Sequence, residues 1–81
     1  MDTFALHILS PEGTLLKGAV SLLTLPGIAG PFTVLPGHAP LVTALEAGRI
    51  RYIQDGQEHF LPIREGFAEV TRNGVNVCVE V

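Results

Sequence analysis

Apolar and polar residues alternate along most of this chain, in short runs that end at turn residues. A period of two is typical of a β-strand that buries one face, because successive side chains point to opposite sides of the strand. We therefore expect a sheet-rich fold in which the alternating apolar side chains face a core. The clearest examples are Phe4, Leu6 and Ile8 near the start of the chain and Val75, Val77, Val79 and Val81 at its end.

Turn-forming residues interrupt these runs about every eight to twelve positions, a spacing typical of β-sandwiches and barrels. No stretch of about eleven residues or more shows a helical period, because Gly and Pro recur too often. The pattern predicts an all-β fold, a sandwich or barrel of short strands. The turn signals lie at residues 11–13, 26–31, 36–40, 47–48, 55–56, 66 and 73–74.

Two Xaa-Gly pairs, Asp55-Gly56 and Asn73-Gly74, indicate β-hairpins. A two-residue type I′ turn fixes which residues of the two strands stand opposite each other, so each hairpin has a predicted register. In both registers the apolar residues fall on one face. The predicted partners are Gln54 with Gln57, Tyr52 with His59 and Ile50 with Leu61 in the first hairpin, and Arg72 with Val75, Val70 with Val77 and Ala68 with Val79 in the second.

The length and composition indicate one small domain with a partly apolar surface. The chain has 81 residues, and we expect residues 1–81 to fold as a single unit. Hydrophobic residues make up 47% of the chain and charged residues 16%, against about 25% charged in ordinary soluble domains. This composition points to a protein partner that covers part of the surface.

Residues 18–45 contain no Asp, Glu, Lys or Arg. Four Gly and four Pro interrupt this charge-free stretch, so we reject a membrane-spanning helix, which needs about 20 largely uninterrupted apolar residues. Two readings remain open. The stretch supplies core strands joined by loops, or it supplies a surface that is uncharged because it meets another protein.

The residue types that usually carry chemistry are scattered. His7, His38 and His59 lie in three separate segments, and Cys78 is the only cysteine, so we expect no metal site and no internal disulfide. The two serines lie outside nucleophile-elbow patterns, and the glycines at positions 27 and 30 lack the lysine and helix of a phosphate-binding loop. We therefore expect no catalytic residue, no cofactor and no bound nucleotide.

The net charge and the first residues of the chain bear on its binding partners and its cellular compartment. The net charge is −3 and the five basic residues form no cluster, which argues against nucleic-acid binding. The start of the chain lacks the basic flank of a signal peptide and is too acidic for a transit peptide. A single free cysteine fits a reducing cytoplasm.

The segment Pro36-Gly37-His38-Ala39-Pro40 is predicted to be a rigid loop with one polar ring. The two prolines restrict the backbone on either side of the histidine, and the glycine permits unusual dihedral angles. Two readings are again open. The loop presents the imidazole for recognition, or it is an ordinary turn whose imidazole bonds nearby backbone.

Several runs of residues share a pattern with one protein family. These runs are LPG at residues 25–27, FTVLPGHAPLVTAL at 32–45, AGRIR at 47–51, GFAEV at 66–70 and NGVNV at 73–77. They resemble the epsilon subunit of F-type ATP synthases, and the resemblance extends over essentially all 81 residues. It implies a flattened ten-stranded β-sandwich and a non-catalytic subunit of the central stalk, which links the gamma subunit to the membrane c-ring and couples ion-driven rotation to ATP synthesis.

The same resemblance implies which residues face these partners. Ser10, His38 and Thr43 are expected on the gamma side. Ile28, Ala29, Gly30, Pro31 and Phe32 are expected to approach the c-ring, and Pro36, Gly37, Ala39 and Pro40 to frame the histidine loop. The resemblance further implies a peripheral location on the cytoplasmic face of the bacterial inner membrane.

The chain departs from the family pattern in several places. Pro31 stands where an acidic or polar residue is expected, and Glu65 stands where the first of two glycines is common. Many members continue into a C-terminal helical hairpin that inhibits ATP hydrolysis, whereas this chain stops at Val81. We therefore expect neither self-inhibition nor a nucleotide site in this polypeptide.

Other classes of small all-β protein fit less well. A biotinyl or lipoyl carrier domain needs a lysine at a tight hairpin tip, and Lys17 lacks that setting. A ligand-binding or catalytic barrel built on His38 needs a convergent set of polar groups, which the sequence does not offer. An oligonucleotide-binding barrel needs a basic, aromatic groove, and this chain has one Tyr and no Trp.

Overall fold

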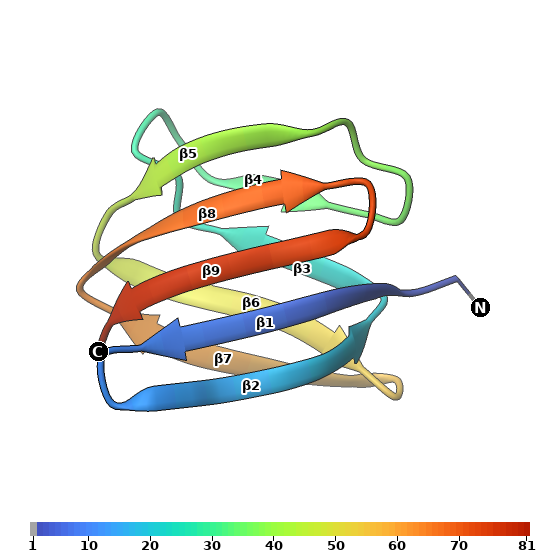
Figure 1. Cartoon of the computed structure of the whole chain (residues 1–81), viewed down its shortest axis with the longest axis horizontal. Helices are drawn as coiled ribbons and strands as arrows, with labels where there is room; N and C mark the ends of the chain where they lie inside the picture. The colour runs from blue at the N-terminus through green and yellow to red at the C-terminus, as the bar shows by residue number, and fades with distance from the viewer. Residues whose placement is uncertain (1) are drawn as a thin grey trace.

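The computed structural model describes residues 2–81, which form nine β-strands and no helix. Figure 1 shows the strands and the short turns that join them. The strands begin and end close to the predicted turn signals, because Gly, Pro, Asn and Asp favour the dihedral angles that reverse a chain. The strands are β1 (Phe4–Ser10), β2 (Gly13–Val20), β3 (Leu22–Leu25), β4 (Phe32–Val34), β5 (Leu41–Leu45), β6 (Gly48–Gln54), β7 (Gln57–Ile63), β8 (Glu65–Thr71) and β9 (Gly74–Glu80).

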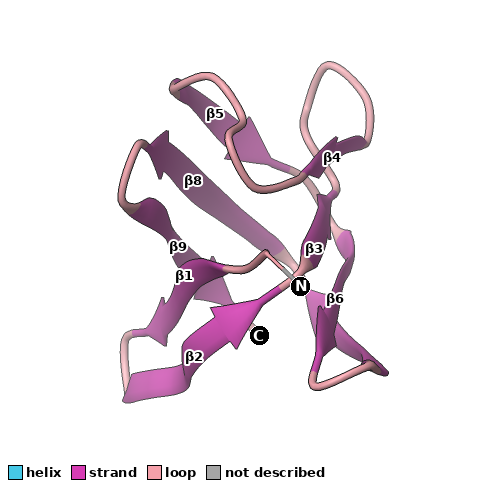
Figure 2. Ribbon diagram, turned by 90° about the vertical axis from the view of Figure 1, so that its right-hand side faces the viewer, coloured by secondary structure: helices cyan, strands magenta, loops and turns pink. Residues whose placement is uncertain are grey.

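The strands form two sheets that face each other, as Figure 2 shows, so the predicted all-β sandwich is confirmed. The five-stranded sheet has the order β2-β1-β9-β8-β5, and the four-stranded sheet has the order β4-β3-β6-β7. Neighbouring strands are antiparallel except β1 and β9, which are parallel. The resemblance implied ten strands. Residues 2–81 form nine, and Gly27 makes only an isolated bridge with Leu45.

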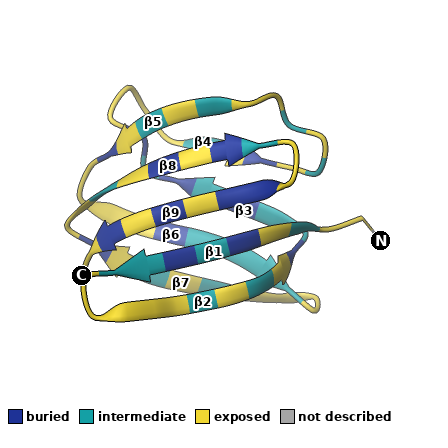
Figure 3. Cartoon of the chain, in the orientation of Figure 1, coloured by how far each residue is buried: buried dark blue, intermediate teal, exposed yellow. Residues whose placement is uncertain are grey.

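The core lies between the two sheets and, within residues 2–81, contains no buried polar or charged side chain. Leu6, Ile8 and Val77 are buried almost completely, which confirms that the alternating apolar residues face inward. The alternation of buried and exposed positions is visible along β8 and β9 in Figure 3. The prediction fails for Val81, which lies beyond the end of β9 and is exposed.

The hairpin of β6 and β7 has the predicted register. Its turn residues Asp55 and Gly56 have φ values of +53° and +76°, as a type I′ turn requires. Tyr52 stands opposite His59, and their rings stack with centroids 5.0 Å apart. The turn sequence alone therefore predicted this pairing, because both turn residues tolerate positive φ.

The hairpin of β8 and β9 forms, but its predicted register is wrong. Thr71 pairs with Gly74, so the two loop residues are Arg72 and Asn73. The Thr71 hydroxyl accepts a hydrogen bond from the Asn73 amide at 3.2 Å, which supports a turn with glycine in the fourth position. Partners shift by two positions, so the buried face is unchanged. The observed partners are Val70 with Val75, Ala68 with Val77 and Gly66 with Val79.

Candidate partner-binding surface

The β3–β4 loop, residues 26–31, is held against the end of β5 by backbone hydrogen bonds. The Ile28 amide donates to the Ala44 carbonyl at 3.0 Å, and the Glu46 amide donates to the Pro26 carbonyl at 2.9 Å. The loop is thus fixed beside the edge of the five-stranded sheet. A surface that is ordered before binding loses less entropy when a partner covers it.

Gly27 forms the base of this loop because no side chain fits there. A Cβ at Gly27 would lie 2.7 Å from the Gly30 carbonyl oxygen and 3.0 Å from the Phe32 ring. The Gly30 amide donates to the Gly27 carbonyl at 2.9 Å and closes the turn. The loop presents an uncharged and largely apolar tip. Its exposed residues are Ile28, Ala29, Gly30 and Pro31, while Phe32 is half-buried.

The β4–β5 loop, residues 35–40, holds the imidazole of His38 close to its own backbone. The His38 amide donates to the Leu35 carbonyl at 3.1 Å, and the ring Nδ1 lies 2.7 Å from the Ala39 carbonyl oxygen. Gly37 has a φ of +83°, so the predicted need for an unusual dihedral angle is confirmed. The imidazole therefore lies against nearby backbone, as expected if the segment is an ordinary turn. The side chain of Leu35, in the same loop, remains exposed. Pro36 is half-buried, and Ala39 and Pro40 are exposed.

Ser10, Thr43 and His38, which were expected to share one partner, do not form one cluster. Ser10 ends β1, and its hydroxyl accepts a hydrogen bond from the Glu12 amide at 3.3 Å. Figure 1 places the end of β1 and the β4–β5 loop at opposite ends of the sandwich. Thr43 stands opposite the fully buried Ala68 in the middle of β5, so its side chain lies on the inner side of that edge strand.

The charge-free stretch at residues 18–45 supplies both core strands and exposed apolar side chains. It contributes buried side chains to the core, among them Val20, Leu23 and Leu25. It also leaves three large apolar side chains in solvent: Ile28 is 65% exposed, Leu35 51% and Val42 61%. These three lie on the two loops and on β5, the edge strand between them. We call this set the uncharged edge.

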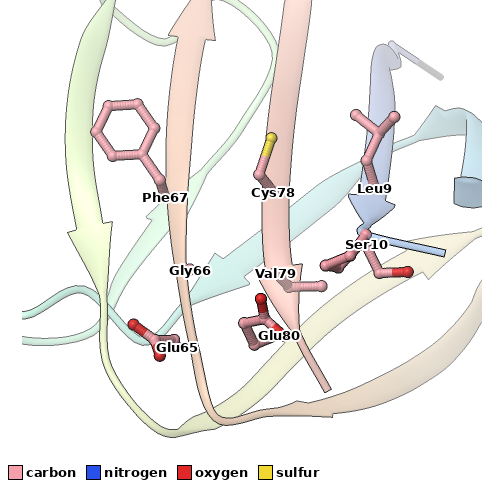
Figure 4. Close-up of a pocket in the computed structure, with 9 residues that line it drawn as sticks. Leu9, Ser10, Glu65, Gly66, Phe67, Cys78, Val79 and Glu80 are labelled. Atoms are coloured by element: carbon pink, nitrogen blue, oxygen red, sulfur yellow. The ribbon is translucent and has the colours of Figure 1, made fainter. Parts of the chain in front are cut away.

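Sequence reasoning missed a second surface, on the outer face of the five-stranded sheet. One outward residue from each of four adjacent strands stands in register and forms a row across the sheet. A groove of about 540 Å³ follows part of this row, and Figure 4 shows the side chains that line it. The only sequence signal was that these four residues are apolar although they occupy positions that, in an alternating strand, point outward and are usually polar. The row is Ala44 of β5, Phe67 of β8, Cys78 of β9 and Leu9 of β1.

The side chains that usually bind metal ions are scattered in the part of the chain that the structure describes. Within residues 2–81, His, Cys, Asp and Glu side chains do not gather in groups of three or more that suit a metal ion. The three histidines lie on β1, in the β4–β5 loop and on β7. No helix in the same part of the chain is long and apolar enough to cross a membrane.

The sequence matches one known protein family over nearly its whole length. A family model described as "ATP synthase, Delta/Epsilon chain, beta-sandwich domain" matches residues 3–81. A protein named ATP synthase epsilon chain from Lawsonia intracellularis is 43% identical over 93% of this chain and 56% of its own length. One with the same name from Desulfitobacterium hafniense is 40% identical over 96% of this chain and 59% of its own length. The chain thus spans less than two thirds of these relatives.

Comparison of the structure agrees on the fold. A chain of the Euglena gracilis mitochondrial ATP synthase OSCP/F1/c-ring structure superposes with a TM-score of 0.89 at 24% identity, covering 95% of this chain and 50% of that one. A chain of the Tetrahymena thermophila mitochondrial ATP synthase central stalk and c-ring structure superposes with a TM-score of 0.83 at 11% identity. This match covers 99% of this chain and 65% of that one. Such low identities carry information about the fold alone.

Proposed function

The chain belongs to the family of ATP synthase delta/epsilon chain β-sandwich domains, and from this membership we propose that it acts as the N-terminal domain of an epsilon subunit. In this role it links the gamma subunit to the membrane c-ring and transmits ion-driven rotation toward the catalytic subunits. The whole chain acts as one domain on the cytoplasmic face of the bacterial inner membrane.

The uncharged edge is the observation that carries this proposal. Ile28, Leu35 and Val42 leave large apolar areas in solvent along one side of a small protein, and no charged residue interrupts them in sequence. Such a surface favours a protein interface, since the centre of an interface is depleted in charge. The backbone bonds of the β3–β4 loop support it further, because they order the loop in advance.

The proposal assigns residues 28–32, the tip of the β3–β4 loop and the first residue of β4, to the c-ring side. Because the tip is uncharged, it binds by packing rather than by pairing charges. Ser10, His38 and Thr43 are assigned to the gamma side. Since they lie in three places, they mark the outline of an extended contact and not a single pocket.

The subunit has a mechanical role and needs no cofactor. It therefore works by rigid contact, for which a sandwich with fixed loops is suited. We also propose that these 81 residues neither inhibit ATP hydrolysis nor bind nucleotide on their own.

Co-purification from native membranes tests the proposal. The chain carries a tag, the membranes are solubilised mildly, and the recovered proteins are identified while ATP hydrolysis is assayed. We expect gamma, the catalytic subunits and the c subunit to be recovered together with the chain. Recovery of the chain alone from the soluble fraction would overturn the proposal while leaving the family and the fold unchanged.

A further inference from the structure

The groove on the outer face of the five-stranded sheet combines an apolar floor with an acidic end. Its floor is formed by Leu9, Phe67 and Cys78, from three adjacent strands. Phe67 is 48% exposed. Aromatic side chains, Phe included, are enriched at protein interfaces relative to the rest of a protein surface.

Two carboxylates close one end of this groove. Glu65 of β8 stands directly opposite Glu80 of β9, and both side chains are exposed. Figure 4 shows them beside the row of apolar side chains. Like charges directly opposite each other on neighbouring strands are destabilising. A third carboxylate, Glu69, follows Phe67 two residues along β8 on the same face.

These carboxylates form no ion pair with a basic side chain of residues 2–81. The one ion pair within residues 2–81 joins Arg51 to Glu58 on the four-stranded sheet. The groove therefore presents a half-exposed aromatic ring between carboxylates that form no ion pair within residues 2–81. A positively charged partner would relieve their mutual repulsion, which is the charge complementarity that guides protein association.

We propose that this groove binds a positively charged amphipathic helix of a partner protein. A helix is favoured over an extended strand because the groove lies on the face of a sheet, where no backbone groups are free to pair with a strand. The apolar stripe of the helix covers Phe67 and Leu9, and its Lys or Arg side chains reach Glu65 and Glu80. The acidic end disfavours nucleic acid and anionic lipid surfaces.

This binding goes beyond the proposed assembly and is separable from it. Ser10 lies at the rim of the groove, so a helix bound there lies next to the proposed gamma contact. A peptide titration of the isolated chain measures the groove alone. If the peptide did not bind, the expected co-purification with the synthase would still stand. If the chain did not co-purify with the synthase, the result of the peptide titration would still stand.

The test uses a synthetic amphipathic peptide of about 18 residues, or five helical turns, built from Leu on one face and Lys on the other. A twin peptide carries Glu in place of Lys. Amide chemical shifts of the ¹⁵N-labelled 81-residue chain are followed during titration. We expect saturable shifts at Leu9, Phe67 and Cys78 with the Lys peptide, and none with the Glu peptide.

Substitutions of groove residues show whether the peptide binds in the groove. Replacing Glu65→Gln together with Glu80→Gln is expected to raise the Kd about tenfold, roughly threefold for each exposed charge contact. Phe67→Ala is expected to raise it by at least about tenfold.

Matched controls lie on the opposite sheet. Asp55→Asn with Glu58→Gln removes the same charge, and Phe60→Ala removes a ring that is 45% exposed; both are expected to leave the Kd within about twofold. Three results would overturn the proposal: shifts confined to the four-stranded sheet, equal binding of the Glu peptide, or equal weakening by the controls.

Discussion

Gly74 sits where three strands meet. It begins β9, pairs with Thr71 of β8 and lies beside Ala5 of β1 in the parallel pair. Its φ is +148°, and a Cβ there would lie 2.5 Å from the Ala5 carbonyl oxygen. This residue therefore serves two strand contacts, whereas its sequence context Asn-Gly suggested only a hairpin turn.

Gly74→Ala is expected to lower the free energy of unfolding by at least about 2 kcal/mol, through both the dihedral strain and the contact with Ala5. Gly13→Ala is the matched control. Gly13 has a similar φ of +132°, but a Cβ there would meet nothing within 4 Å, so about 1 kcal/mol is expected from strain alone. Urea unfolding of both variants gives the comparison, and equal losses would show that the parallel contact is not tight.

His38→Ala is expected to leave the domain folded, because the half-buried ring bonds only the neighbouring Ala39 carbonyl in the described chain. The expected change in Tm is a few degrees at most, as for other surface substitutions. Under the proposed function, retention of the chain on the solubilised synthase falls at the same time. His7→Ala, on the outer face of β1, is the control and is expected to retain binding. Unchanged retention of the His38→Ala chain would make the loop an ordinary turn.

At the scale of elements, the β3–β4 loop is the clearest case of structure that prepares a surface. Its backbone bonds to the end of β5 fix the tip, and the apolar tip residues Ile28, Ala29 and Pro31 are exposed. The sequence predicted a turn here from Pro and Gly. It did not predict the pairing with Ala44, because hydrogen bonds between segments distant in sequence leave no local pattern.

Ile28→Asp is expected to preserve folding, since the side chain is 65% exposed. Under the proposed function, it reduces c-ring recovery at least about tenfold, because it places a charge in an apolar contact. Leu15→Asp is the control. Leu15 is 44% exposed on β2, which forms the edge of the five-stranded sheet opposite to β5. Subunit recovery after mild solubilisation is the measurement. If both variants lost the c subunit equally, the effect would be one of general destabilisation.

Local chemistry predicted some elements well and others poorly. The register of β6 and β7 followed from Asp55-Gly56, because that turn is determined by the two residues themselves. The register of β8 and β9 did not follow from Asn73-Gly74, because β1 on the other side of β9 also constrains the glycine. The groove of Phe67, Cys78 and Leu9 required knowledge of which strands are neighbours, and a single sequence does not contain that order.

At the scale of the whole molecule, the core is small, so a bound partner can add substantially to the free energy of unfolding. The buried set is limited to apolar side chains between two sheets, and Cys78 provides no cross-link. Domains of this size rarely gain more than about 3–5 kcal/mol from a core alone. A protein that binds only the folded state stabilises it by mass action.

Under the proposed function, addition of the purified gamma subunit is expected to raise the Tm of this chain. At a free gamma concentration about 100 times the Kd, the gain is about 2.7 kcal/mol, or more than about 10 °C for a domain of this size. Thermal unfolding with and without gamma provides the measurement, and bovine serum albumin serves as a non-binding control. An unchanged Tm would contradict the linkage.

The parallel pair of β1 and β9 joins the first strand of the chain to the last. During synthesis on the ribosome, β1 and β2 emerge first, yet the inner edge of β1 has no neighbour until residues 74–80 have been made. The sheet therefore closes only when translation has passed Glu80, and such long-range pairing is slow to form. Chains that terminate early are left with an open edge of β1 and a divided sheet.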